Sequence, residues 1–599
     1  MSALGRDAVA AAAFLGVERS LTGRRWLSRG GDERLAAAIS QRLAAPEVVG
    51  RVLAARGVAP DDAESFLNPT LRDLLPDPGH LKGMDAAAAR VARAVESGER
   101  IAVFGDYDVD GATSSALLER FLGAVGGVAR VYIPDRVVEG YGPNGPALRR
   151  LRAEGCALVL TVDCGTTAFE ALAEAQSCGL DVIVVDHHAA EARLPAAIAV
   201  VNPNRIDDAS PHKHLAAVGV CFLLAVAVNR LLRERGWYAQ RPAPDLMRWL
   251  DIVALGTVCD VVPLAGINRA LVAQGLKVMA KRGNAGLAAL ADVAGMRERP
   301  EAWHLGYALG PRVNAGGRVG EAGLGARLLA TDDPTEAATI AARLDEHNRE
   351  RQQIEAVVLL AAIEQVEAQA PASSSSSPLV LAAGEGWHPG VIGIVASRLK
   401  DRYNRPACVV AIEGGEAKGS GRSVRGLDLG AAVIAARQAG ILTKGGGHAM
   451  AAGFSLDPQR LPELRAFLDD RLSRQAAGEL VPTLELDGAL DCGGATRELV
   501  ETIARCGPFG AGNEEPRFVI SAARVSWSKV VGTGHVSCTL AGAGNTRLKA
   551  IAFRCMDGPL GQALLNPGPP LHLAGTLRLE TWQGETSVKL HIDDAAPAR

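Results

Sequence analysis

The chain has 599 residues, 48% apolar and 22% charged, which is typical of a globular protein with about three or four domains. No apolar stretch reaches the roughly 18 residues of a membrane span, and the net charge of −3 means that a nucleic-acid partner would need a local basic groove. The ten cysteines form no CxxC pair, which argues against zinc ribbons and redox dithiols and favours a reducing, cytoplasmic location.

The first half of the chain predicts a parallel sheet. Residues 1–80 are expected to form a helical, alanine-rich N-terminal extension, and from about residue 85 short apolar strands alternate with amphipathic helices. The expected strands are 101–104, 129–133, 157–162 and 182–185, and the expected helices are 113–124, 146–154 and 168–178. This alternation indicates a parallel sheet with crossover helices, and the apolar strands indicate that both sheet faces are covered.

The second half predicts a long helix followed by two further domains. Residues 212–295 are expected to be mostly helical, and 335–367 to form one charged helix that Pro334 begins. The serine run within 371–378 favours a flexible break, and a second α/β block follows at about 379–475. Five alternating runs then predict a small barrel of the OB type, with strands at 517–525, 535–540, 548–553, 571–579 and 586–592.

We therefore expect an α/β protein with five parts. These are an N-terminal extension at 1–80, a parallel-sheet catalytic domain at 81–330, a connecting helix at 331–371, a smaller α/β domain at 372–476 and an OB-type β-barrel at 477–599.

Acidic and imidazole side chains follow the apolar runs of the first α/β block. They are Asp106, Asp108, Asp110, Asp163, Asp186, His187, His188 and Asp260. We expect residues 106–110 to form an extended loop that enters a helix at Thr113, so that alternate carboxylates converge. Ligands of open α/β sheets bind outside the carboxyl ends of the strands, where these groups would meet. Carboxylates favour Mg²⁺ or Mn²⁺, and an imidazole among them favours Mn²⁺.

Two other interpretations compete with a metal site of this kind. An EF-hand also begins with the pattern D-x-D-x-D-G, but its twelfth position would be Leu117, where calcium needs a bidentate Glu. Each acid could also be an ordinary surface residue, although so many neighbouring carboxylates repel one another without cations. Two metal ions about 3.5–4 Å apart would generate a hydroxide and stabilise a leaving oxygen, which is the chemistry of phosphodiester hydrolysis.

These residues resemble the DHH phosphoesterase superfamily, whose signature triplet is Asp186-His187-His188 here. The glycine-rich segments 310–318, 386–393, 419–423, 445–453 and 507–513 extend the similarity to the superfamily's single-stranded-DNA-specific exonucleases, over roughly residues 80–595. The resemblance implies a DHH domain, a DHHA1 domain and an OB fold. It also implies 5′→3′ degradation of single-stranded DNA to mononucleotides with two Mn²⁺ or Mg²⁺ ions, in DNA repair and recombination.

The resemblance assigns roles to individual residues. It implies metal ligation by Asp108, Asp110, Asp163, His187 and Asp260, with Asp163 bridging the ions, and Asp106 as a ligand or an orienting group. His188 would support a ligand or contact the substrate. Cys259 departs from the family, where a smaller residue is expected. The implied substrate-binding residues are Arg136, Tyr141, Arg312, Asn314, Arg318, Ser420, Arg422 and His448.

Each substrate-binding assignment has a structural alternative. Arg136 and Tyr141 could belong to an ordinary surface loop, residues 310–318 could form a plain tight turn, and His448 could be a buried structural histidine instead of part of a phosphate-binding loop. Aromatic and basic residues of the barrel suit single strands, or else form its core and solvated surface: Phe518, Trp527, Lys529, Arg547, Lys549, Arg554 and Arg578.

The implied partners are single-stranded DNA, a single-strand-binding protein and a helicase, with no membrane. Two rival functions remain open. One is another DHH phosphodiesterase that acts on oligonucleotides or cyclic dinucleotides. The other is a degenerate single-strand-binding scaffold, against which the intact Asp108, Asp110, Asp163, His187 and Asp260 argue.

Overall fold

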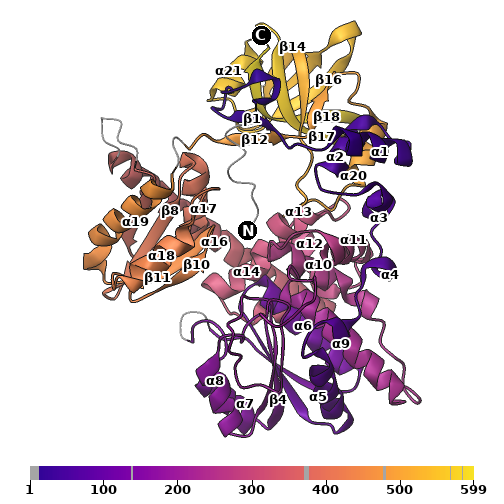
Figure 1. The fold of residues 1–599 in the computed structure, drawn as a ribbon, viewed down its shortest axis with the longest axis vertical. Helices are drawn as coiled ribbons and strands as arrows, with labels where there is room; N and C mark the ends of the chain where they lie inside the picture. The colour runs from indigo at the N-terminus through magenta and orange to yellow at the C-terminus, as the bar shows by residue number, and fades with distance from the viewer. Residues whose placement is uncertain are drawn as a thin grey trace. The chain divides into compact units, whose positions relative to one another are not determined.

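The computed structural model describes residues 12–135, 139–369, 377–476, 480–566, 568–582 and 584–598. The chain divides into two compact units, drawn in Figure 1. The parallel-sheet unit contains Glu64–Glu350 and Arg505–Glu515, and the mixed unit contains Met1–Ala63, Arg351–Ala504 and Pro516–Arg599. Helix α16 (Pro334–Gln369) begins in the first and ends in the second, and it confirms the predicted long helix.

The described residues of the parallel-sheet unit form one five-stranded, wholly parallel sheet. Its strand order is β3 (Val128–Tyr132), β2 (Arg100–Gly105), β4 (Cys156–Val162), β5 (Asp181–Val185) and β6 (Ala199–Val201). The first four confirm the predicted strands. The three-residue strand β6 was not predicted, although it lies within the apolar run 196–201.

Helices cover both faces of this sheet, as the apolar strands predicted (Figure 1). Ile101 and Val103 of β2 pack into the core shared with α5 (Met84–Glu96), α6 (Val109–Ala124) and α9 (Ala217–Glu234). Phe104 of the same strand faces the other core, which α7 (Gly145–Ala153) and α8 (Phe169–Ser177) complete.

The start of α6 corrects one prediction. The helix begins at Val109 and not at Thr113, because Asp108 is its N-cap and accepts a hydrogen bond from the Gly111 amide at 3.0 Å. Asp110 therefore lies in the first helical turn, and the acids 106–110 do not alternate along an extended loop.

The predicted helical region is confirmed and extends further than expected. It comprises α10 (Leu250–Cys259), α11 (Gly266–Met279), α12 (Ala285–Val293), α13 (Ala302–His304), the π-helical segment Leu305–Leu309, α14 (Gly310–Val319) and α15 (Leu324–Ala330). The glycine-rich segment 310–318 is therefore a helix, and the expectation of a turn there was wrong. A Cβ at Gly317 would lie 2.5 Å from the Tyr107 carbonyl oxygen, so glycine here permits close packing of α14 on the loop after β2.

The mixed unit contains the second α/β block. Its five-stranded sheet has the order β10 (Lys444–His448), β11 (Ala451–Leu456), β9 (Glu416–Arg422), β8 (Ala407–Glu413) and β7 (Val380–Glu385), and only β7 and β8 pair in parallel. The accompanying helices are α17 (Ile392–Tyr403), α18 (Leu429–Gln438) and α19 (Leu461–Gln475). His448 ends a strand of the β10–β11 hairpin and is exposed, so it is neither in a loop nor a buried structural histidine.

The five predicted C-terminal strands are also confirmed. The sheet has the order β13 (Gly488–Leu490), β14 (Phe518–Val531), β15 (His535–Ala541), β16 (Arg547–Ala552), β18 (Glu585–Pro597) and β17 (Leu571–Trp582), and β14 pairs with β17 as well. Helices α20 (Arg497–Ala504) and α21 (Pro559–Leu565) accompany it. Phe518 is a buried core residue and not a DNA-contacting aromatic, whereas Trp527 is half-exposed.

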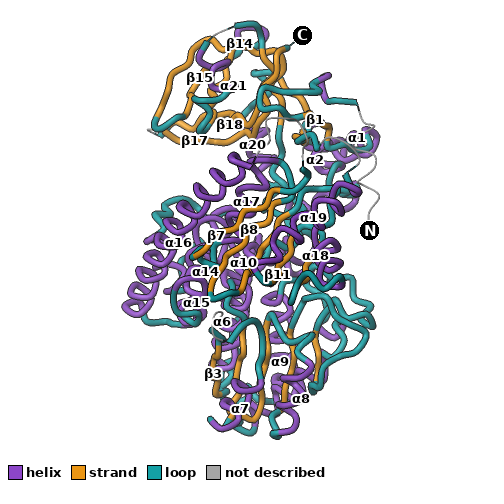
Figure 2. The backbone as a smooth tube through the Cα atoms, turned by 90° about the vertical axis from the view of Figure 1, so that its left-hand side faces the viewer, coloured by secondary structure: helices purple, strands orange, loops and turns teal. Residues whose placement is uncertain are grey.

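The N-terminal extension is helical only in part (Figure 2). Its helices are α1 (Glu33–Leu43), α2 (Glu47–Ala54), α3 (Ala63–Leu67) and α4 (Leu71–Leu74). The unpredicted strand β1 (Arg25–Ser28) pairs in parallel with β12 (Thr483–Leu486), and the buried Trp26 donates its indole N–H to Asp594 at 2.9 Å. No helix in the described part of the chain combines the length and apolar character needed to cross a bilayer.

Candidate metal centre

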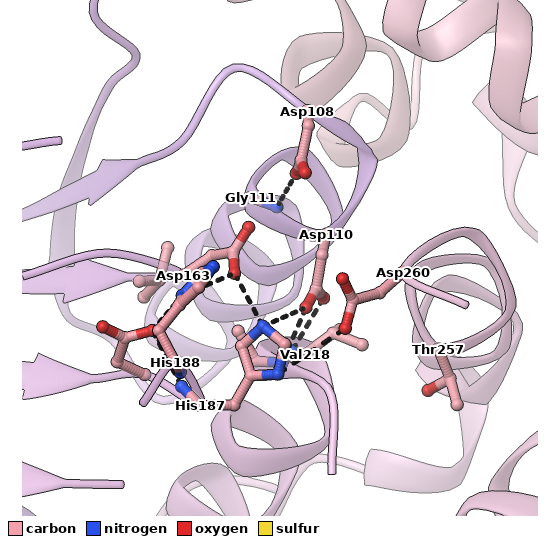
Figure 3. A network of polar contacts seen from close by, with 12 residues as sticks. Asp108, Asp110, Gly111, Asp163, His187, His188, Val218, Thr257 and Asp260 are labelled. Carbon is pink, nitrogen blue, oxygen red and sulfur yellow. Dashed lines mark hydrogen bonds and ion pairs between the residues drawn. The ribbon is translucent and has the colours of Figure 1, made fainter. Parts of the chain in front are cut away.

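The carboxyl ends of neighbouring parallel strands bring the predicted acids together. Asp106 follows β2, Asp163 follows β4 and Asp186 follows β5, and these strands are hydrogen-bonded neighbours in the order β2, β4, β5. A Cβ at Gly111 would overlap the Asp106 backbone, so only glycine lets the first turn of α6 pack against this strand end. Figure 3 shows the side chains of Asp110, Asp163 and Asp260 directed toward His187.

Asp110 is held firmly by the start of another helix. Its two carboxylate oxygens accept hydrogen bonds from the backbone amides of Ala217 at 2.6 Å and Val218 at 2.9 Å, in the first turn of α9. The N-terminus of a helix favours a negative charge. Burial and the neighbouring Asp108 carboxylate nevertheless raise the pKa of Asp110 to about 7, so the helix compensates its charge only in part.

His187 contacts acids through both of its ring nitrogens. Nε2 lies 3.3 Å from Asp163 Oδ1 and 4.0 Å from Asp110 Oδ2, and Nδ1 lies 3.6 Å from Asp260 Oδ2. Burial lowers the pKa of His187 to about 4, so the ring is neutral near physiological pH, the form in which imidazole binds metals.

Asp260 is contributed by a helix end and not by a strand end. It caps the C-terminal end of α10, and a Cβ at Gly256, one turn earlier, would overlap Thr113 of α6. Glycine therefore lets α10 lie against α6, which carries Asp110. Burial and the Asp110 and Asp108 carboxylates raise the pKa of Asp260 to about 9.

Asp186 is a scaffold of the site. Its carboxylate accepts the backbone amides of His187 at 2.7 Å, His188 at 3.2 Å and Thr166 at 3.1 Å, and lies 2.8 Å from His188 Nδ1. Burial alone would raise the pKa of Asp186, but the hydrogen bonds to His188 and Thr166 and the charges of the two histidines together outweigh it and hold that pKa below its usual range. Burial would lower the pKa of His188, but the contact with Asp186 and the nearby Asp260 and Asp108 carboxylates together raise it to about 9. With its oxygens so engaged, Asp186 positions the two histidines.

The donor atoms fit divalent cations. Among the described residues, three groups have ligand atoms within 4.8 Å of one another: Asp106, Asp108 and Asp163; Asp110, His187 and Asp260; and Asp163, His187 and His188. The buried atoms Asp163 Oδ1, His187 Nε2 and Asp260 Oδ2 make no hydrogen bond. Burial and the surrounding carboxylates raise the pKa of Asp163 well above its ordinary value, which marks negative charge without a compensating cation. The structure thus gathers all six predicted ligands.

The backbone of Asp163 is unusual. Its φ of +61° lies in the left-handed region, and its amide donates to the Val185 carbonyl at 3.1 Å. The Tyr141 hydroxyl donates to the Asp163 carbonyl at 3.1 Å, and the Tyr141 ring, 54% exposed, lies edge-on to His188 with 6.1 Å between centroids. Tyr141 is therefore beside the candidate metal centre, whereas Arg136 lies outside the described residues.

Two residues that support the histidines were not predicted from the sequence. The buried Asn202 donates through Nδ2 to Thr166 Oγ1 at 2.9 Å and to the His188 carbonyl at 2.8 Å, and Asn204 donates to the His187 carbonyl at 2.5 Å. A signal was present in the sequence, because Asn202 follows the apolar run of β6 as the acids follow theirs.

The other predicted substrate residues of this unit lie on α14. Arg312 donates to Asp345 Oδ1 at 2.9 Å and to the Ala308 carbonyl at 2.7 Å, so much of its guanidinium is engaged within the protein. Asn314 and Arg318 are half-buried on the same helix. The contact of Gly317 with Tyr107 places this helix against the loop between Asp106 and Asp108.

Ser420 and Arg422 lie together on β9 of the mixed unit. Arg422 donates to Ser420 Oγ at 3.3 Å, and a Cβ at Gly393, in the first turn of α17, would lie 3.1 Å from both side chains. His448 on β10 and Arg422 on β9 both pair with Ala451 of β11, so their side chains point to the same face, about 10 Å apart. Burial lowers the pKa of Arg422.

Comparison with known proteins agrees with this arrangement. Family models for the N-terminal domain of the DHH family, the DHHA1 domain and the RecJ OB domain match residues 100–257, 376–474 and 486–594. The chain is 38% identical to the single-stranded-DNA-specific exonuclease RecJ of Dickeya dadantii, over 92% of this chain and 96% of that protein. It is 35% identical to RecJ of Bacillus subtilis, over 96% of this chain and 71% of that protein.

A solved structure shares the fold. The crystal structure of Thermus thermophilus RecJ in complex with Mn²⁺ superimposes with a TM-score of 0.79 at 31% identity, covering 95% of this chain and 79% of that chain. Fold and site together define a DHH-type α/β protein with a DHHA1 and an OB domain. The chain belongs to the RecJ family of single-stranded-DNA-specific exonucleases.

Proposed function

We propose that this chain is a metal-dependent exonuclease that degrades single-stranded DNA in the 5′→3′ direction to mononucleotides, in DNA repair and recombination. The observation that carries the proposal is the set of three overlapping groups of ligand atoms, which share Asp163 and His187, at the carboxyl edge of the parallel sheet. Proteins 34–38% identical over most of the chain are named as single-stranded-DNA-specific exonucleases, which supports the substrate class.

The residues that would hold two Mn²⁺ or Mg²⁺ ions are Asp106, Asp108, Asp110, Asp163, His187 and Asp260. Asp163 belongs to two of the three groups, which supports its role as the bridging carboxylate. When bound, such a pair of ions supplies a hydroxide nucleophile near neutral pH and stabilises the leaving oxygen. His188, which Asp186 fixes and whose side chain is partly exposed, would donate a hydrogen bond to a substrate phosphate.

The strand would be held by further side chains. Tyr141 offers an exposed ring for a base beside the metal centre, and Arg136, Arg312, Asn314 and Arg318 are the proposed phosphate contacts of the parallel-sheet unit. Ser420, Arg422 and the first turn of α17 form the proposed pocket for a terminal 5′-phosphate, since a guanidinium and a helix N-terminus both favour phosphate. His448 faces the same side of the sheet as Arg422.

The proposed function also implies domain boundaries. We assign the extension to 1–80, the DHH catalytic domain to 81–330, the connecting helix to 331–371, the DHHA1 domain to 372–476 and the OB domain to 477–599. The three matched family models fall inside the DHH, DHHA1 and OB ranges, which supports these boundaries. A cytoplasmic location fits cysteines that are all unpaired in the described structure. A helicase and a single-strand-binding protein are the proposed partners, because duplex DNA must first be unwound and then kept single-stranded.

Digestion of single strands labelled at the 5′ or the 3′ end tests the function. With Mn²⁺ or Mg²⁺ we expect a 5′ label to appear in mononucleotides at the earliest times, while a 3′ label stays on shortening strands; chelation stops the reaction. Release from the 3′ end would refute the polarity. Preferential cleavage of dinucleotides would favour another DHH phosphodiesterase, and binding without cleavage would favour the non-enzymatic scaffold.

A further inference from the structure

The parallel-sheet unit contains a short segment from far along the chain. Arg505–Glu515 belongs to the same compact unit as the predicted metal ligands, although the OB strands on either side of it do not. The segment packs on residues 261–264, the loop that joins Asp260 to α11. The Leu264 amide donates to the Ala511 carbonyl at 2.7 Å, which ties the two stretches together through their backbones.

Glycines bring the segment unusually close to this loop. Gly512 has a φ of +68°, and a Cβ there would lie 2.9 Å from Pro263 Cβ. A Cβ at Gly510 would lie 2.7 Å from Leu264 Cδ1. Gly510 and Asn513 exchange backbone hydrogen bonds of 3.0 and 3.1 Å, so the segment is a defined turn that presents its backbone to Pro263 and Leu264.

Two buried side chains of α11 complete the attachment. Arg269, 2% exposed, donates to the Gly507 carbonyl at 2.5 Å and to the Phe66 carbonyl at 2.9 Å. Asn268 donates through Nδ2 to the Pro263 carbonyl at 3.1 Å and to the His214 carbonyl at 2.6 Å. The loop after Asp260 is therefore fixed from one side by α11 and from the other by the distant turn.

The carboxylate of Asp260 is held less directly than that of Asp110. Asp110 is held by two backbone amides of α9, whereas Asp260 is the C-cap that follows α10, and the next residue, Val261, is 70% exposed and has a φ of +59°. The Asp260 carboxylate lies 3.6 Å from His187 Nδ1, directly before the loop on which the distant turn packs.

We propose that the turn Gly510–Asn513 is a positioning element of the metal centre, which fixes residues 261–264 and thereby the Asp260 carboxylate. This inference rests on the proposed function, since it takes Asp260 as a metal ligand. Groups that orient a ligand from behind affect metal affinity by about 10–100-fold, so disturbing the turn should weaken binding at the Asp260 side of the centre.

Two glycine substitutions in the full-length chain separate contact from backbone strain. Gly512→Ala adds a methyl group against Pro263 at a φ of +68°, while Gly544→Ala adds one at a φ of +65° with nothing within 4 Å. Both variants carry similar strain, and only the first touches the Asp260 loop. We expect Gly512→Ala to raise the Mn²⁺ dissociation constant, measured by calorimetry, at least about tenfold, and Gly544→Ala to match the wild type.

Activity offers a second readout. Nuclease activity of Gly512→Ala should return toward the wild-type rate at saturating Mn²⁺, because the defect lies in affinity. If Gly512→Ala does not fold, Gly510→Ala is the milder variant, since its methyl meets the movable end of a leucine side chain; it should raise the dissociation constant a few-fold.

Wild-type Mn²⁺ affinity in a folded Gly512→Ala protein would overturn the inference, as would an equal loss in Gly544→Ala. Failure of the wild type itself to bind Mn²⁺ would instead overturn the proposed function, so the two failures are distinguishable.

Discussion

The carboxyl edge of the parallel sheet and the β9 region of the mixed sheet make opposite electrostatic demands. The first gathers buried carboxylates whose pKa values are raised by burial and by one another, as for Asp163 and Asp260. The second holds Arg422 partly buried beside the first turn of a helix. Cations would stabilise the first region and an anion the second, which are the charges of the metal ions and the terminal phosphate in the proposed function.

The two regions also differ in how firmly they are built. The metal edge has an inner scaffold, in which Asp186, Asn202 and Asn204 fix the histidine backbone through hydrogen bonds of 2.5 to 3.2 Å. Arg422 is tied on its own strand to Ser420 and Gly421. The candidate metal ligands thus have the more extensive hydrogen-bonded support, while the proposed phosphate pocket would rely on charge and a few donors.

Removing the carboxylate that two of the ligand groups share should have the largest effect. Asp163→Ala deletes a ligand of two of the three groups, so nuclease activity should fall by about 10³-fold or more, because several kcal/mol of transition-state stabilisation are lost. Single-strand binding, measured by fluorescence anisotropy, should survive within a few-fold. Mn²⁺-dependent cleavage at the wild-type rate would refute the bridging role.

The β9 region is tested by Arg422→Ala. A charge-assisted hydrogen bond is worth about 1.5–3 kcal/mol, so the KM for 5′-phosphorylated strands should rise by about 10–100-fold, with little change for 5′-hydroxyl strands. Mn²⁺ affinity should not change. The control is Arg425→Ala, which removes an exposed arginine nearby that pairs with Glu485 at 2.6 Å. Equal effects on both substrates would argue against a phosphate pocket.

The scaffold of the metal edge is tested by Asn202→Ala. The change leaves the His188 carbonyl and Thr166 without a donor, so the histidines should lose their fixed geometry. We expect about a tenfold fall in kcat and a similar loss of Mn²⁺ affinity, with Arg422-dependent discrimination of 5′ ends intact. A loss of that discrimination with normal Mn²⁺ affinity would assign Asn202 to substrate binding.

The pH dependence of metal binding tests the same carboxylates without a substitution. The pKa values of Asp110 and Asp260, about 7 and about 9, exceed the unfolded value near 3.8, so both groups bind protons that metal must displace. Mn²⁺ affinity should therefore rise with pH between pH 6 and 8, by up to about tenfold per unit for each of the two groups that is still protonated. For the same reason the metal-free fold loses stability from these carboxylates as pH rises from about 4 to about 9. The gain in Tm on adding Mn²⁺ should thus be larger at pH 8 than at pH 6; a pH-independent gain would contradict the raised pKa values.

Local patterns were sufficient for much of the fold and of the candidate site. Apolar runs ending in acids located β2, β4 and β5, and the parallel arrangement brought the acids to one edge. The start of α6 was misplaced because its N-cap, Asp108, had been interpreted only as a ligand. The same carboxylate both caps a helix and belongs to a candidate ligand group.

Two further errors concern glycine-rich segments, which were predicted as a turn and a loop. Gly316 and Gly317 favour a turn by helix propensity, but close packing against Tyr107 and Leu344 makes them part of α14. In the same way, Gly445–Gly447 pair as a strand against β11. Other contacts join residues far apart in sequence: the β1–β12 pair, and the attachment of 505–515 to Pro263 and Leu264. The local sequence of these segments does not indicate which residues they contact.

The left-handed backbone of Asp163 has a consequence for engineering. A φ of +61° costs a non-glycine residue about 1 kcal/mol, and glycine would relieve both this strain and the repulsion among the buried carboxylates. A library selected only for heat resistance in the absence of metal should therefore enrich the substitution Asp163→Gly. Such molecules would be robust and inert, so thermostabilisation of this protein has to be screened with the divalent ion present.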